Sequence, residues 1–313
     1  MKKVLIPTAL DSVAKQILED HGGYAVVQVP KCDVLQLVRD NPDVHALIVR
    51  SEKITAEIID AAPQLKVVVR AGAGYNTIDI AHARAKGVDV MNTPGANSNG
   101  VAEEVVALML ADARRLIPAD ASCRAGKWEK TAFMGTEITG KTIGIVGLGY
   151  IGRLVVKRLS GFEPTFLGYD PGITMRQATE MGVKLVSLDE LFSQSDYVTL
   201  HLPEIAETKG MVNAKLIGQM KPGATLINCA RAGIVNEADL RVLKAEKKIR
   251  FLNDVYPKDE EGPKSVADVA DIMVPHLGAS TREANFKAAE IAAQELIDLD
   301  EKGIDKAVVN KAK

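Results

Sequence analysis

The sequence predicts an α/β protein built from two doubly wound parallel sheets. Strand-like apolar runs alternate with helix-like segments along nearly the whole chain, which is typical of parallel sheets covered by helices on both faces. The alternation breaks at Asn92-Thr-Pro-Gly95, where turn-forming residues indicate a linker. We therefore expect one sheet before this linker and another after it.

The first unit is expected to open with a buried strand, Val4–Ile6, followed by alternating helices and strands. Its other strands are predicted at 46–49, 65–69 and 88–91, and its helices at 13–20 and 56–61. After the linker, Ala, Val, Leu and Met recur on the faces of a helix from about Gly100 to about Arg115. The second unit is predicted to have strands at 142–146, 166–169, 197–200, 225–228, 250–254 and 272–274, and a helical pattern at 281–302 is expected to return to the first unit.

Composition argues against several broad classes of protein. Hydrophobic residues make up 47% of the chain, enough for sizeable cores, and the formal net charge of −2 disfavours a general nucleic-acid or membrane-surface protein. No apolar run approaches the roughly 18 residues of a membrane-spanning helix. Cys32, Cys123 and Cys229 are widely separated and odd in number, so we expect no disulfide framework, no metal site and a reduced, cytoplasmic setting.

Two glycine-containing segments match phosphate-binding patterns in different contexts. Gly135–Thr142 has the letters of a P-loop, but an apolar strand follows where a P-loop needs a helix. Gly147-Leu-Gly-Tyr-Ile-Gly152 follows a strand and precedes the helix-like run 153–159. That order favours a dinucleotide site, in which the first glycine permits a tight turn, Gly149 lets the backbone approach a pyrophosphate, and the third lets helix and strand pack closely.

An acidic residue strengthens the dinucleotide interpretation. Asp170 ends the next predicted strand, 18 residues after Gly152, which is where a carboxylate that bonds the adenosine ribose is expected. The same charge would repel a 2′-phosphate, so the sequence favours NAD over NADP. An aspartate at a strand end is also a common turn or helix cap, and the prediction therefore rests on strand, glycines and acid together.

Three polar segments fall near the expected carboxyl ends of strands, where α/β sheets bind ligands. They contain Arg231, the acidic run from Asp259 to Glu261, and His276. An arginine can hold a substrate carboxylate, and a histidine oriented by a carboxylate can remove a hydroxyl proton. Each residue alone also has a structural interpretation, as a surface ion pair, a solvated turn or a core histidine.

Taken together, the motifs resemble the D-isomer-specific 2-hydroxyacid dehydrogenases. The similarity covers nearly the whole chain and is carried by residues 70–79, 92–94, 147–152, 228–233 and 276–281. The resemblance implies a flavodoxin-like substrate domain (1–96 and 283–313), a Rossmann-type NAD domain (97–282) and a homodimer. Segments 49–51, 126–130 and 133–137 are most similar to the branch that oxidises 3-phosphoglycerate, and we expect a short form of that branch that lacks its C-terminal regulatory domain.

The resemblance also implies roles for individual residues. Arg231, His276 and either Asp259 or Glu260 would be catalytic. The substrate, a small anionic 2-hydroxy or 2-oxo acid, would be held by Arg50, Arg70, Ala73, Gly74 and Asn97. NAD would be held by Gly147, Gly149, Tyr150, Ile151, Gly152, Asp170, Cys229, Ala230, Asp254 and Gly278.

The chain departs from the family pattern at two places, and these leave alternatives open. Counting from Asp254 places Asp259 in the position of the catalytic acid, whereas counting from Arg231 reaches Glu260. The loop after Arg50 is one residue short and contains Glu52, a negative charge near the expected phosphate position. A hydroxypyruvate or glyoxylate reductase, a sulfolactate dehydrogenase and, more remotely, an NAD-sensing corepressor-like protein are therefore alternatives.

Overall fold

A computed structural model describes residues 1–311 and divides the chain into two compact units. The first unit comprises Met1–Asn97 together with the chain from Ser280 onward, and the second is Ser98–Ala279. The first boundary lies one residue later than expected and the second three residues earlier. The shift at the second boundary follows from Thr281, whose side chain caps the last helix and therefore belongs with it.

The first unit has a five-stranded parallel sheet in the order β2-β1-β3-β4-β5. This is the doubly wound order in which the topological switch point lies between β1 and β3. Its strands are β1 (Lys2–Ile6), β2 (Tyr24–Gln28), β3 (Val44–Val49), β4 (Val67–Arg70) and β5 (Asp89–Asn92). Its helices are α1 (Val13–Asp20), α2 (Val34–Arg39), α3 (Ala56–Asp60), α4 (Ile80–Ala85) and α12 (Arg282–Lys302).

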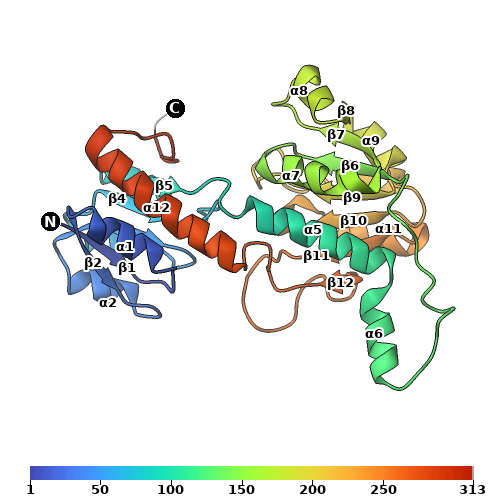
Figure 1. The fold of residues 1–313 in the computed structure, drawn as a ribbon, viewed down its shortest axis with the longest axis horizontal. Coiled ribbons are helices and arrows are strands. Elements are labelled where there is room, and N and C mark those ends of the chain that lie inside the picture. Colours follow the sequence, from blue (N-terminus) through green and yellow to red (C-terminus); the bar gives the residue numbers. More distant parts are fainter. Residues whose placement is uncertain (312–313) are drawn as a thin grey trace. The chain divides into compact units, whose positions relative to one another are not determined.

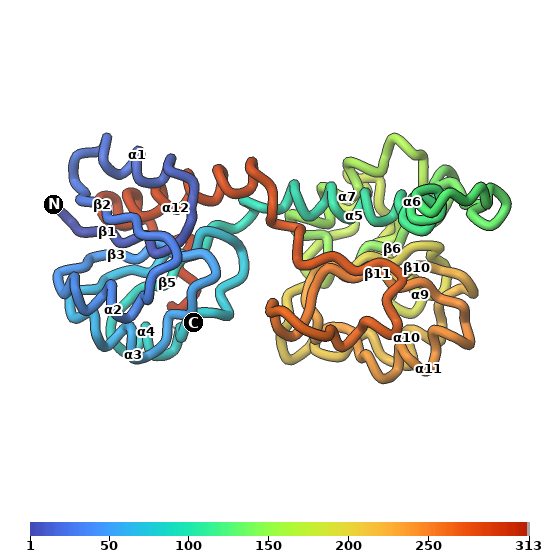
Figure 2. Tube along the Cα trace, turned by 90° about the horizontal axis from the view of Figure 1, so that it is seen from below, coloured from blue at the N-terminus to red at the C-terminus, as the bar shows by residue number. Residues whose placement is uncertain are grey.

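Strand periodicity gives this sheet two apolar faces. Val4 and Ile6 of β1 pack into a core with α1 and α12, while Leu5 packs into the core beneath α2, α3 and α4. The buried side of α12 is an alanine stripe that includes Ala289 and Ala293. Figure 2 shows α12 beside α1 although the two helices lie at opposite ends of the sequence.

The second unit has a seven-stranded parallel sheet in the order β12-β11-β10-β9-β6-β7-β8, the Rossmann order with one added strand (Figure 1). Its strands are β6 (Thr142–Val146), β7 (Thr165–Tyr169), β8 (Val183–Leu185), β9 (Tyr197–Leu200), β10 (Thr225–Asn228), β11 (Arg250–Asn253) and β12 (Ile272–Met273). Its α-helices are α5 (Ser98–Ala113), α6 (Leu116–Arg124), α7 (Tyr150–Leu159), α8 (Met175–Glu180), α9 (Leu188–Gln194), α10 (Ala214–Gln219) and α11 (Glu237–Lys247), with short 3₁₀ turns at Ser160–Phe162 and Ala232–Ile234.

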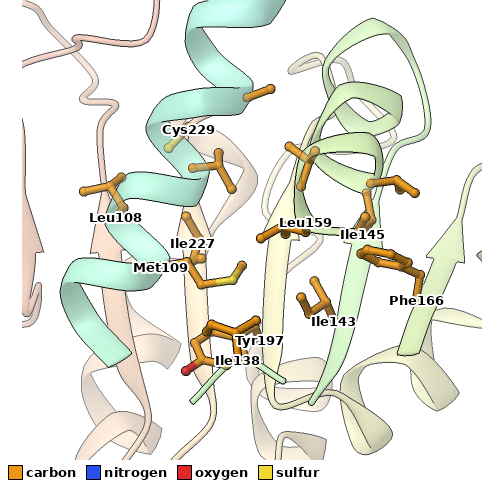
Figure 3. Close-up of a cluster of buried hydrophobic side chains, with 14 of the residues drawn as sticks. Leu108, Met109, Ile138, Ile143, Ile145, Leu159, Phe166, Tyr197, Ile227 and Cys229 are labelled. Atoms are coloured by element: carbon orange, nitrogen blue, oxygen red, sulfur yellow. The ribbon is translucent and has the colours of Figure 1, made fainter. Parts of the chain in front are cut away.

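Helices cover both faces of this sheet as well. On one face, α5 and α7 pack over the central strands, and Figure 3 shows Met109 of α5 extending toward Ile143 and Tyr197 of that sheet. On the other face, α9, α10 and α11 bury apolar side chains against the same strands. No described helix is long and apolar enough to cross a membrane.

The expected fold class is confirmed, with local corrections at element ends. The helix after the linker ends at Ala113, not near Arg115, because Arg115 takes a left-handed backbone conformation (φ 56°) that no helix continues. β4 begins at Val67 because Leu65 is held in a turn by a hydrogen bond from its N–H to the carbonyl of Ala62. Two strands at the edges of the sheets were not predicted: β2, which is only partly buried, and β8, which is three residues long.

Candidate active site

The glycine loop of the second unit joins β6 to α7. Gly147 has a φ of 97°, and its N–H donates to the carbonyl of Tyr169 over 2.8 Å. A Cβ on Gly152 would lie 2.1 Å from the carbonyl oxygen of Gly147, so helix and loop can approach only without a side chain there. A Cβ on Gly149 would meet nothing within 4 Å. The loop therefore leaves open space at the N-terminus of α7, where N–H groups and the helix dipole favour phosphate.

Asp170 fixes this loop from the end of the neighbouring strand, β7. Its two carboxylate oxygens accept hydrogen bonds from the backbone N–H of Leu148 (2.7 Å) and of Gly172 (2.8 Å). Each oxygen retains a second lone pair for a further donor, such as a ribose hydroxyl. Tyr150 is exposed and Ile151 is partly buried against the core. These residues fit an adenine dinucleotide, since an open loop and an acidic strand end are both present.

The segment after β10 is held by the amide of Asn228. This side chain donates to the carbonyl of Arg231 (3.0 Å) and accepts from the N–H of Ala230 (3.1 Å). Cys229 and Ala230 are buried, whereas Arg231 is half-buried and its guanidinium donates to the carbonyl of Ala230 over 2.6 Å. The turn thus holds Arg231 at the carboxyl end of the sheet, where a carboxylate ligand is expected.

Asp254 joins the end of β11 to the loop that contains His276. Its carboxylate oxygens accept hydrogen bonds from the N–H groups of Leu277 (2.6 Å) and Gly278 (3.2 Å). The carboxylate of Asp254 is almost completely buried, and burial raises its pKa despite those two donors. Asp254 therefore fixes the backbone on the C-terminal side of His276.

His276 pairs with Asp259, one of the two acids that the sequence left open. The Nδ1 atom of His276 lies 2.6 Å from Oδ2 of Asp259. Glu260 faces cations instead, with Lys264 bonded to its carbonyl oxygen and Lys258 3.8 Å from its carboxylate. No hydrogen bond found within residues 1–311 uses Nε2 of His276, so this nitrogen remains available for a substrate proton.

Asp259 lines a cavity of about 450 Å³. The other residues around it are mostly polar or charged: Tyr256, Glu260, Glu261, Lys264 and Pro275. The side chains of His276 and Asp259 are 42% and 56% exposed. Solvent or a small ligand can therefore reach the pair in the structure as described.

Glu104 of α5, whose two carboxylate oxygens are buried, was not predicted as a site residue from the sequence. Ligand atoms of Glu104, Cys229 and Asp254 lie within 4.8 Å of one another. Burial and the neighbouring charge of Asp254 raise the pKa of Glu104 to about 8. Its place between Val101 and Leu108, on the apolar face of the helix, is the signal that could have identified it.

In the first unit, Arg70 ends β4 and folds back over Gly72. A Cβ on Gly72 would lie 1.3 Å from the guanidinium of Arg70, and the φ of this glycine is 147°. Asn92, at the end of β5, donates its amide to the carbonyl of Ala73 over 2.6 Å. Among the hydrogen bonds found in residues 1–311, none uses the N–H of Ala73 or Gly74. Two adjacent backbone donors are thus available for an anion.

Arg50 and Asn97 complete the residues expected to hold substrate in this unit. Arg50 follows β3, and its guanidinium donates to Oδ1 of Asn285 over 2.9 Å. The side-chain oxygen of Asn97 is buried and has no hydrogen-bond partner among the described residues. A buried polar atom of this kind is costly unless a ligand or water satisfies it.

The second unit combines a Rossmann-type sheet, an open glycine loop and a histidine–carboxylate pair, and this combination is the one expected of the dinucleotide-binding dehydrogenase class. Residues 106–278 match the family model "D-isomer specific 2-hydroxyacid dehydrogenase, NAD binding domain". The chain therefore belongs to this family and contains its NAD-binding domain.

Within this family, the chain is similar to curated D-3-phosphoglycerate dehydrogenases. The chain is 40% identical over 302 residues to the D-3-phosphoglycerate dehydrogenase of Homo sapiens, covering 96% of this chain and 56% of the relative. It is 42% identical over 268 residues to that of Archaeoglobus fulgidus, covering 84% and 51%. The chain thus spans about half the length of these curated relatives.

A solved structure matches over its full length. The NAD⁺-bound 3-phosphoglycerate dehydrogenase of Entamoeba histolytica superposes with a TM-score of 0.82 at 32% identity, covering 100% of this chain and 99% of that one. An NAD-dependent formate dehydrogenase from Staphylococcus aureus, in complex with NAD, gives 0.83 at 27% identity, with full coverage of both chains.

Proposed function

We propose that the chain catalyses NAD-dependent oxidation of a D-2-hydroxy acid at C2, with 3-phosphoglycerate as the substrate and 3-phosphohydroxypyruvate as the product, the entry to serine biosynthesis. The observation that carries the proposal is the His276–Asp259 pair at 2.6 Å, in the same unit as the glycine loop. The similarity to D-3-phosphoglycerate dehydrogenases supports the choice of substrate.

The proposed cofactor site consists of the open glycine loop at Gly149, the N-terminus of α7 and the carboxylate of Asp170. When bound, NAD supplies the acceptor for the hydride that leaves C2. Asp170 would accept ribose hydroxyls and repel a 2′-phosphate. Replacing Asp170 with Ala should therefore weaken NAD and reduce its advantage over NADP, as measured by kcat/KM with each cofactor. Equal efficiency of both cofactors in the unmodified enzyme would contradict this assignment.

The proton and the substrate carboxylate would be handled by side chains of this chain. His276 must be neutral to begin oxidation, so that Nε2 can accept the hydroxyl proton while Asp259 holds Nδ1. The guanidinium of Arg231 would hold the carboxylate and polarise the C2 oxygen. Arg50 would bind the phosphate, because a guanidinium offers the paired donors that phosphate geometry requires.

A substrate panel tests the proposal. NADH absorbance would be followed with D-3-phosphoglycerate, D-glycerate and glycolate, and in reverse with hydroxypyruvate and glyoxylate. We expect the phosphorylated acid to give the highest kcat/KM. Preference for glyoxylate or hydroxypyruvate would favour the reductase alternative, and binding of NADH without turnover of any acid would favour a nucleotide-sensing protein.

We also propose that the chain forms a homodimer through α6 and the segment that follows it to residue 137. Large apolar side chains on this stretch are exposed: Leu116 by 54%, Ile117 by 53%, Trp128 by 88% and Met134 by 81%. An exposed apolar group of this size supports a protein interface. Light scattering should show a dimer that Trp128→Glu weakens, and a monomer at all concentrations would contradict the proposal.

A further inference from the structure

A carboxylate of the chain itself occupies the backbone donors at the end of β3. Oε2 of Glu52 accepts hydrogen bonds from the backbone N–H groups of Arg50 (2.8 Å) and Ser51 (3.1 Å). Two adjacent N–H groups that converge on one oxygen form the kind of concave anion site seen in backbone nests. In this structure that site already holds a negative charge.

The topology places this turn where a ligand is expected. In the order β2-β1-β3-β4-β5, the switch point lies between β1 and β3, and doubly wound sheets bind ligands outside the carboxyl ends of these strands. Arg50 is the first residue after β3, and its side chain extends to Asn285 on α12. A guanidinium and two backbone donors therefore belong to one turn at the switch point, with Glu52 bonded to the backbone pair.

We propose that Glu52 is a specificity-determining residue that competes with the second anionic group of the substrate for the N–H groups of Arg50 and Ser51. This inference rests on the proposed function, in which Arg50 binds that second anion. A phosphate that enters the turn must either displace the Glu52 carboxylate from the two N–H groups or bind next to it. In the second case the negative charges of the phosphate and of Glu52 repel each other. A substrate without a second anion meets neither cost.

A structural role for Glu52 makes a different prediction. If the carboxylate only stabilises the turn, its removal should alter stability or kcat/KM equally for all substrates. If it competes with the second anion, its removal should change the ratio of kcat/KM for the phosphorylated acid to that for the unphosphorylated acid. The ratio is measured on one variant, so differences in the folded fraction cancel.

The experiment compares Glu52→Gln with a matched control, Glu57→Gln, in the full chain. Glu57 lies in the same unit on α3, is 67% exposed and pairs with Arg39, so the control removes an equal charge away from the turn. For each protein, kcat/KM would be measured with D-3-phosphoglycerate and D-glycerate. Because hydrogen bonds to charged groups are among the stronger ones, we expect Glu52→Gln to raise the ratio about tenfold.

A second measurement does not depend on turnover. Binding of inorganic phosphate would be followed by calorimetry, and it should tighten in Glu52→Gln relative to both the unmodified chain and Glu57→Gln. An unchanged ratio and unchanged phosphate binding in Glu52→Gln would overturn the inference, as would an equal rise in both variants. If no 2-hydroxy acid were oxidised at all, the proposed function would fail, whereas tighter phosphate binding confined to Glu52→Gln would still support a competing carboxylate.

Discussion

Replacing Glu104 with Gln should make the folded protein less sensitive to rising pH. Burial and the adjacent charge of Asp254 raise the pKa of Glu104 to about 8, while an unfolded glutamate titrates near 4.3. Between these values the folded state retains a proton that the unfolded state has lost, so stability falls as pH increases. Below the unfolded pKa both states are protonated and the effect vanishes. Gln has no proton to lose and removes the dependence.

The size of the effect follows from the shift and from exposure. Each pKa unit corresponds to about 1.4 kcal/mol of differential stability. The side chain of Glu104 is only partly buried, although both of its oxygens are, so solvent screening reduces the effect to about 1–3 kcal/mol across the window. The gain of Glu104→Gln over the unmodified chain should therefore be near zero at pH 4 and largest above pH 8.

Urea unfolding from pH 4 to pH 9, followed by circular dichroism, measures this difference. Glu103→Gln is the matched control, because Glu103 is the next residue on the same helix, is exposed, and lies 3.7 Å from Arg158. The control should leave the pH dependence of the free energy of unfolding unchanged. Parallel curves for Glu104→Gln and the unmodified chain would refute the reasoning and would mean that Glu104 ionises freely in the folded state.

Three further outcomes are expected. Gly149→Ala should fold normally, because its Cβ meets no protein atom within 4 Å, but the Cβ should occupy space needed by the cofactor and weaken NADH binding measured by fluorescence. Gly152→Ala should weaken NADH binding and also lower the melting temperature, because its Cβ would lie 2.1 Å from a backbone oxygen. Equal melting temperatures for the two variants would contradict this reasoning. Asp259→Asn should slow turnover and alter its pH profile while Glu260→Gln does not; the reverse result would transfer the role to Glu260. Asp300→Asn should cost about 1–3 kcal/mol at pH 7 in urea unfolding. Although burial opposes it, hydrogen bonds from a histidine and a lysine hold the pKa of Asp300 below its usual value, so its contribution is present above the pKa of an unfolded aspartate, about 3.9, and declines as pH falls toward the lower folded value; a cost of Asp300→Asn that did not decline at all as the pH fell below 4 would contradict this origin.

Sequence patterns specified much of the fold because the strands are buried on both faces. Thr142–Val146 and Tyr197–Leu200 were predicted with their observed bounds, since apolar runs between turn formers are distinctive. The edge strand Tyr24–Gln28 is only partly buried beyond its first residue and gives a weaker pattern. Where a strand gains its burial from tertiary neighbours, local sequence is a poor guide to its existence.

The candidate site was harder to specify from sequence, because it depends on loop geometry. Asp259 and Glu260 are neighbours in a loop, where no helical or strand periodicity indicates which side chain faces the site. Only the path of the chain to His276 distinguishes them. Glu104 was overlooked because a single acid in an apolar helix face is read as exposed until the residues opposite are known. The chemical roles assigned to Asp259 and His276 remain predictions.

The placement of α12 has a consequence for how the protein is made. Residues 98–279, which form the second unit, leave the ribosome before residues 282–302, yet α12 supplies the alanine stripe that buries one face of the first sheet. Domains generally fold as units during synthesis. The second unit can thus be complete while β1 and β3 still lack their cover, so the segment translated first is the last to gain its core. Until α12 emerges, the nascent chain must keep that apolar face from associating with other chains.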